Sequence, residues 1–341
     1  MSKFSPEALD DLDDHQARQR ATIDQFNAAM EAEDSETAHA IADYVINADD
    51  VSNKMFSRGW QMHCLNWLTA HHFSRWRNSP DDSEEEDESL SGLLDCLWKF
   101  KWLVGVLPSD LHESREDIAE AVQHMADLYE EFNFSRRMVD KALMEQAILM
   151  GDTQAAQEHF AKWQAADKDD MNDCEACETN ALVDYYHFIG DYQQAVKLAK
   201  PILLGELSCG EVPHLTYYPA IDSLIQLGEV EDATDSLTEA IQYIDEAGDN
   251  FMFIMPKLIQ LAYKLNDKDW AESLLDDYND TIIQVIQNSR YDYLQYLIAV
   301  APFNEEALLA ARGLAREFDE RNGNRYYQNQ LALMFTPPIV H

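Results

Sequence analysis

Four residues near the middle of the chain have side chains that commonly bind zinc. Two residues separate Cys174 from Cys177, and His214 follows Cys209 five positions later. Three thiolates and one imidazole suit a tetrahedral Zn²⁺ ion, because cysteine sulfur and histidine nitrogen are its usual ligands in structural sites. The residue types therefore predict a zinc site formed by Cys174, Cys177, Cys209 and His214.

Pairs of helices must position these ligands, and a sequence pattern that predicts such pairs returns about every 38 residues. A turn residue recurs at steps of 39, 38 and 38 residues, and Ala follows it five positions later each time; the turn residues are Gly151, Gly190, Gly228 and Asn266. Gly and Asn can adopt the left-handed conformation that ends a helix, and a small Ala lets the next helix pack closely. A fixed period of this length indicates stacked helix pairs, each burying its apolar face against its neighbours.

All four ligands lie at or just before the first helix of two adjacent repeats. Cys174 and Cys177 lie 16 and 13 residues before Gly190. Cys209 and His214 lie 19 and 14 residues before the turn of the next repeat. Stacking places such helix starts about 8–10 Å apart, a gap that side chains can bridge with metal bonds of about 2.0–2.3 Å. A closed, structural site is expected, and an open fourth position would require water in place of His214.

The alternative interpretation is three buried, reduced cysteines and a solvent-facing histidine, because small, apolar Cys suits a tight junction between repeats. Five cysteines in a chain that begins without a secretory signal indicate reduced thiols in a cytoplasmic protein. Cys64 and Cys96 lie in apolar stripes and are expected in the core.

The residues around the second turn resemble a known repeat family. Residues 188–199 read Phe-Ile-Gly-Asp-Tyr-Gln-Gln-Ala-Val-Lys-Leu-Ala, which is similar to the turn and second helix of a tetratricopeptide repeat. Tyr186 and Ala199 fall where that family has an aromatic and a small residue, whereas Thr179 stands in place of its usual Trp. The units are also longer than the usual repeat of about 34 residues. The resemblance covers about 135–275 and is weaker near 22–50. It implies a right-handed α-solenoid of stacked antiparallel helix hairpins, whose concave groove holds protein segments.

The chain as a whole is expected to be all-α, since no run of alternating apolar and polar residues indicates a strand. We divide it into irregular N-terminal helical repeats (1–134), regular repeats (135–275), and C-terminal helices with a capping tail (276–341). An aromatic stripe occupies one expected helix: Phe56, Trp60, Cys64, Trp67, His71 and Trp76. It is interpreted as a seam between helices, and the alternative is a ligand cage.

The formal charge of −39, from 64 acidic and 25 basic residues, argues against binding to nucleic acid or to an anionic membrane. Two interpretations remain. The charge serves solubility or adaptation to a saline cell interior, or it attracts a basic protein partner.

The densest acidic segment lies within 78–91, which is expected to be a solvated loop because like charges repel one another. Its acids are candidate partner-binding residues: Asp81, Asp82, Glu84, Glu85, Glu86, Asp87 and Glu88. They serve either as an electrostatic attractor for a basic partner or as a plain solvated loop.

The motifs of common enzymes are absent. No Gly precedes Lys, no Gly-x-Gly occurs, and neither Gly-x-Ser-x-Gly nor His-Glu-x-x-His is found. We therefore expect a non-enzymatic protein-binding scaffold, such as a toxin-neutralising immunity protein or a sequestering regulator. The alternatives are a zinc-dependent enzyme that uses the Cys/His cluster and a purely structural module of a larger complex.

Overall fold

The computed structural model describes residues 4–6, 9, 12, 14–47 and 55–335, and these residues form helices and connecting turns without a β-strand. The N-terminal helices are α2 (His15–Glu31), α3 (Ser35–Asn47), α4 (Arg58–Asn78), α5 (Glu84–Val106), η1 (Leu107–Ser109) and α6 (Arg115–Glu131). Those of the middle are α7 (Arg137–Met150), α8 (Thr153–Ala165), α9 (Glu175–Phe188), α10 (Tyr192–Leu203), α11 (His214–Leu227) and α12 (Val230–Ala247). The last are η2 (Gly248–Ile254), α13 (Met255–Lys264), α14 (Lys268–Val285), α15 (Arg290–Val300), α16 (Glu305–Asn322) and α17 (Tyr326–Leu333). No described helix combines the length and apolar character that crossing a bilayer requires. The all-α expectation is confirmed for the described residues.

The periodic turns end one helix and begin the next, as the sequence predicts. Their φ angles are all positive, from 63° to 81° at Asn266, Gly151, Gly228 and Gly190. An Asp after three of these turns caps the following helix, as where the Asp191 carboxylate accepts the backbone N–H of Gln194 at 3.2 Å. The four recurring Ala residues are fully buried, because each lets two helices of a pair approach closely: Ala156, Ala195, Ala233 and Ala271.

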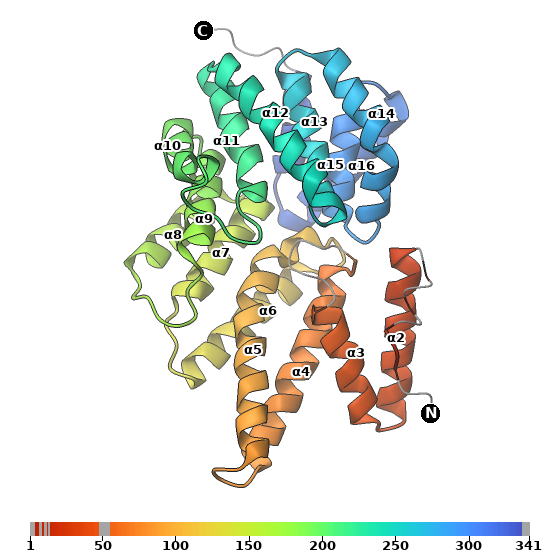
Figure 1. The fold of residues 1–341 in the computed structure, drawn as a ribbon, viewed down its shortest axis with the longest axis vertical. Helices are drawn as coiled ribbons and strands as arrows, with labels where there is room; N and C mark the ends of the chain where they lie inside the picture. Colours follow the sequence, from red (N-terminus) through yellow and green to blue (C-terminus); the bar gives the residue numbers. More distant parts are fainter. Residues whose placement is uncertain (1–3, 7–8, 10–11, 13, 48–54, 336–341) are drawn as a thin grey trace.

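Consecutive helices pack in neighbouring pairs, α7 with α8, α9 with α10, α11 with α12, and α13 with α14. The first helices of the pairs also contact one another in series, from α5 through α7, α9, α11 and α13 to α15. Figure 1 shows this succession from the orange α5 through yellow and green to blue. The first helices therefore form an inner row, and their partners lie on its outer side.

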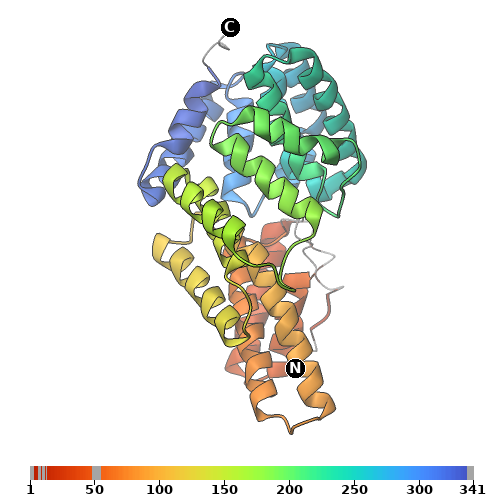
Figure 2. The same cartoon turned by 90° about the vertical axis from the view of Figure 1, so that its left-hand side faces the viewer.

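The C-terminal helices return to the middle of the chain and close this row. The Asn324 amide donates to the Met150 carbonyl at 2.6 Å, and the Tyr327 hydroxyl donates to the carbonyl of Leu149. A β-carbon at Gly151 would collide with the Tyr326 ring, so this turn needs Gly both for its left-handed backbone and for close packing. In Figure 2 the blue C-terminal helices accordingly lie beside the yellow-green helices. The apolar tail predicted as a cap lies mostly in 336–341, outside the described residues.

The structure corrects the loop expected over 78–91. Helix α4 continues to Asn78 and α5 begins at Glu84, so only 79–83 connect them, at the lower tip of the molecule in Figure 1. Ser83 caps α5, its hydroxyl accepting the N–H of Glu86 at 3.1 Å. Four acids of the run, Glu84 to Asp87, then occupy the first turn of α5, where the partial positive charge of the helix N-terminus favours them.

The aromatic stripe of α4 packs as a seam between helices. The Phe26 ring of α2 makes edge-to-face contacts with Trp60 and Trp67, at centroid distances of 5.5 and 5.7 Å. Beside this seam, the His39 ring lies 5.3 Å from the rings of both His71 and His72. Burial, followed by the charges of these neighbours, lowers the pKa of His71 to about 4.

This histidine cluster is expected to make the protein less stable as the pH falls. The pKa of His71 is lower in the folded chain than the value of about 6.5 in an unfolded one. Between these values the unfolded chain binds more protons, so stability falls as pH drops through that window. The melting temperature of the His71→Phe variant, which keeps a ring against Trp67, should therefore fall less between pH 7 and 5 than that of the wild type. Equal falls would show that His71 does not contribute.

Candidate metal site

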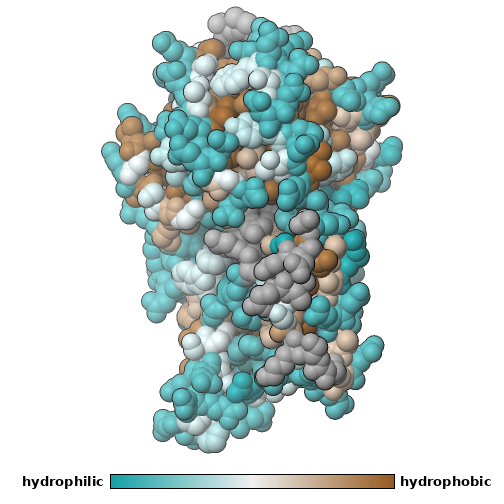
Figure 3. Space-filling model, turned by 45° about the vertical axis from the view of Figure 1, so that its right-hand side comes forward, coloured by the Kyte–Doolittle hydropathy of each residue, from teal (hydrophilic) through white to brown (hydrophobic). Residues whose placement is uncertain are grey.

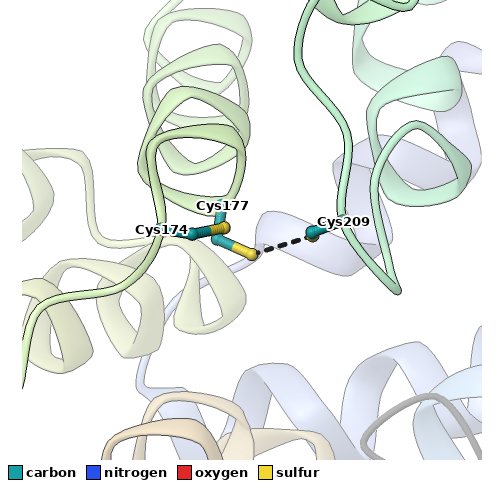
Figure 4. A group of neighbouring side chains, drawn as sticks. All are labelled: Cys174, Cys177 and Cys209. Atoms are coloured by element: carbon teal, nitrogen blue, oxygen red, sulfur yellow. Dashed lines mark hydrogen bonds between the residues drawn. The ribbon is translucent and has the colours of Figure 1, made fainter.

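Three cysteines from two adjacent helix pairs lie together at one edge of the inner row. Cys174 is the residue before α9, Cys177 lies in its first turn, and Cys209 belongs to the loop between α10 and α11. The three sulfur atoms lie within 4.8 Å of one another, and those of Cys177 and Cys209 are 3.2 Å apart (Figure 4). The prediction that the repeat brings these thiols together is confirmed.

His214 does not join them. It opens α11, but its ring stacks on Phe251 of η2 with a centroid distance of 4.0 Å and an interplanar angle of 8°. This contact turns the imidazole toward the next helix pair, and burial lowers its pKa. The structure groups the three thiols without His214, because spacing along the chain does not decide which side of the helix start a ring faces.

The pKa values of Cys174 and Cys177 are shifted in opposite directions. Burial and the neighbouring thiols raise the pKa of Cys177 strongly. Partial burial acts to raise the pKa of Cys174, but hydrogen bonds from nearby N–H groups and thiols outweigh it and leave the pKa below the usual range. One thiolate at the start of a helix is therefore favoured, whereas three so close repel one another. A bound cation would hold all three deprotonated.

Asp173, the residue before Cys174, anchors the thiol cluster to the N-terminal half of the chain. The Asp173 carboxylate pairs with the ammonium groups of Lys101 at 2.8 Å and Lys141 at 3.0 Å. Burial acts to raise the pKa of Asp173, but the two lysines lower it to about 2. Lys141 also pairs with Glu145 at 2.5 Å. This buried network fixes the position from which the chain enters α9.

The thiol cluster lies at the edge of a large central cavity. The cavity has a volume of about 980 Å³ and is lined by α7, α9, α11, α13, α15 and α17, with Cys177, Asp173 and Glu211 on its wall. Five basic and five acidic residues line it: Arg58, Lys141, Lys257, Lys264 and Lys268, and Glu145, Asp173, Asp184, Glu211 and Asp222. Their formal charges cancel, so the net charge of −39 belongs to the rest of the chain.

Three cysteine sulfurs at this separation fit a Zn²⁺ ion, since its structural and catalytic sites both use such ligands. Among the described residues no fourth His, Cys, Asp or Glu joins the thiols at the same distance. The cluster can therefore supply three ligands, with the fourth left to water or to a bound molecule.

The predicted partner-binding acids lie elsewhere. They occupy the tip between α4 and α5, and none of them lines the cavity: Asp81, Asp82, Glu84, Glu85, Glu86, Asp87 and Glu88. Glu85 pairs with Arg75 at 3.3 Å on the surface. The cavity residues Asp184, Tyr218 and Lys257 were missed by sequence reasoning, and their only signal is polar side chains on the first helices of the repeats.

Comparison of the chain with protein-family models, with curated proteins and with solved structures finds no match.

Proposed function

We propose that the protein is a cytoplasmic, non-enzymatic scaffold, a right-handed solenoid of the tetratricopeptide type, that holds a segment of a basic protein partner. A toxin-neutralising immunity protein or a sequestering regulator would act in this way. The observation that carries the proposal is the central cavity, which the first helices of successive pairs line together. A concave surface formed by stacked repeats is what such scaffolds use for binding.

The distribution of charge supports a basic partner. The lining of the cavity carries no net charge, so the acidic excess lies outside it. The outer helices α12 and α14 expose many acids: Glu231, Asp232, Asp235, Glu239, Asp245, Glu246, Asp269, Glu272, Asp276, Asp277 and Asp280. Figure 3 shows hydrophilic side chains over much of the surface in view. Such a field accelerates the encounter with a cationic protein, while the cavity would hold its segment.

A photo-crosslinking residue can identify the partner. Gln226 is exposed and lines the cavity, whereas Glu120 on α6 is exposed but lies outside it. We expect crosslinking in the native host from position 226, but not from position 120, to a protein with a basic isoelectric point. Crosslinks to acidic proteins only, or equally from both positions, would contradict the proposal.

The rate of association with that partner should depend steeply on salt. Between about 0.05 and 0.5 M the screening length shrinks to a few ångströms, so electrostatic attraction is largely lost. Neutralising Glu231, Asp235 and Glu239 should slow association at low salt, and neutralising 81–88 should do so only if the tip also attracts the partner. Stopped-flow measurement checks both. A salt-insensitive rate would refute the electrostatic part, and stability that rises strongly with salt without a cationic partner would favour saline adaptation.

A zinc-dependent enzyme is the second candidate, and one observation favours it. Cys177, Asp173 and Glu211 all line the cavity. A metal ion on the three thiols would have an open coordination position close to carboxylates, as catalytic zinc sites require.

A further inference from the structure

Two opposite charges line the central cavity without pairing with each other. Lys257 projects from α13 and Asp184 from α9. Among the described residues, no carboxylate oxygen lies within 4.0 Å of the Lys257 ammonium, and no Lys, Arg or His nitrogen lies that close to the Asp184 carboxylate. Asp184 accepts only the Asn180 amide at 3.2 Å among the hydrogen bonds of this part of the chain. The two groups nevertheless act electrostatically on each other's pKa.

The other inward-facing charges of this region already have partners. The Asp222 carboxylate pairs with Lys264 and with His187, both at 2.8 Å. Lys141 pairs with Asp173 and Glu145. Lys257 and Asp184 are therefore a partly buried ammonium and a partly buried carboxyl group that make no ion pair in the described part of the chain, whereas Lys268, which also makes none there, is exposed.

Both groups are ionised at neutral pH despite their burial. Burial acts to lower the pKa of Lys257, but Tyr291, Asp292 and Asp184 outweigh it and raise that pKa. The ammonium also lies 5.2 Å from the centroids of the Tyr218 and Tyr291 rings, whose faces attract a cation. Burial raises the pKa of Asp184 to about 6, which leaves it mostly charged at pH 7.5. Two separated charges that are partly withdrawn from solvent are unfavourable until something bridges them.

Phenol groups of the cavity lining, of which Tyr218 lies near Lys257, can complete a site for a carboxylate. Tyr192, Tyr218 and Tyr326 line the cavity from α10, α11 and α17. Their hydroxyls make no hydrogen bond to another described residue. Burial raises the pKa of all three, so each keeps a proton to donate.

We propose that the cavity binds a small zwitterion, by class a free α-amino acid or a dipeptide. Its carboxylate would contact Lys257 and the Tyr218 hydroxyl, and its ammonium would contact Asp184. A lone anion such as phosphate fits less well, because the lining carries no net charge and Asp184 would repel it. The cavity volume of about 980 Å³ leaves room for the ligand's side chain. This inference concerns a small molecule and does not depend on the protein partner proposed above.

The test is a screen of the wild-type protein against the twenty amino acids and a set of Gly-Xaa dipeptides, by thermal shift and then by titration calorimetry. At least one is expected to raise the melting temperature and to bind with measurable heat. Its methyl ester, which lacks the carboxylate, and its N-acetyl derivative, which lacks the ammonium, should each bind at least about tenfold more weakly, the factor that about 1.4 kcal/mol represents.

Variants then assign the two ends of the ligand. Lys257→Met should weaken the zwitterion about tenfold or more while barely affecting the methyl ester, and Asp184→Asn should do the same while barely affecting the N-acetyl derivative. Lys268→Met is the matched control, an exposed lysine of the same lining. The proposal is overturned if no compound binds, or if the ester or the N-acetyl derivative binds as tightly as its parent. That comparison uses the wild-type protein, so it stands even if a variant fails to fold.

Discussion

Replacing Asp173 with alanine is expected to lower the free energy of unfolding by about 3–5 kcal/mol, the usual effect of removing one partner from a buried ion network. The side chain is 5 % exposed and pairs with Lys101 and Lys141, whose own side chains are 1 % and 9 % exposed. Without the carboxylate, two buried ammonium groups lose a shared counterion. Urea denaturation followed by circular dichroism measures the change.

Glu158→Ala provides the control for this prediction. Its ion pair with Lys162 lies on the surface, with side chains 58 % and 50 % exposed. Its loss should change the free energy of unfolding far less than Asp173→Ala does, because solvent screens an exposed ion pair. If Asp173→Ala were no more destabilising than Glu158→Ala, the network would not anchor α9.

Loss of a metal ion held by the three thiols is the second change for which we predict a large effect. When metal is present at about 100 times its dissociation constant, binding to the folded state alone contributes about 2.7 kcal/mol of stability. Cys177→Ser should therefore lose the metal and lower the melting temperature, whereas Cys64→Ser, in the core of α4, should keep the metal.

Chelation should also act locally, because each helix pair depends on its neighbours. Hydrogen exchange is expected to rise first at the start of α9 and in the loop before α11, which the cysteines join, and later in α2 and α3. Uniform acceleration through the whole chain would contradict a metal that joins these two pairs.

The repeating part of the fold could be predicted from sequence because its signals are local. Gly190 and Asn266 adopt the left-handed conformation expected of them, and Ala195 is buried where a small residue is needed. The same register placed Cys177 and Cys209 side by side, because it sets the distance between adjacent helix starts. Local turn chemistry was sufficient for both.

Features that depend on distant contacts could not be predicted. Arg321 donates to the carbonyl of Pro108 at 2.6 Å and to that of Asp110 at 2.8 Å, and these contacts help to close the row of helices. No local sequence pattern predicts these contacts of Arg321. The direction of the His214 side chain is set by its stacking on Phe251. The cavity can be recognised only from the positions of α9 and α13 in the folded chain, since both line it. The directions of side chains and the contacts that close the row of helices could therefore be known only from the structure.

The most direct test of the metal site is zinc analysis with X-ray absorption on protein purified without chelator. We predict about one zinc ion per chain, with three sulfur ligands at about 2.3 Å and one lighter ligand. Exchange of that lighter ligand on addition of imidazole would indicate the open position that the enzyme alternative requires. A protein without zinc that also fails to take it up, or a metal shell with fewer than three sulfur atoms, would contradict the assignment of Cys174, Cys177 and Cys209 as one site.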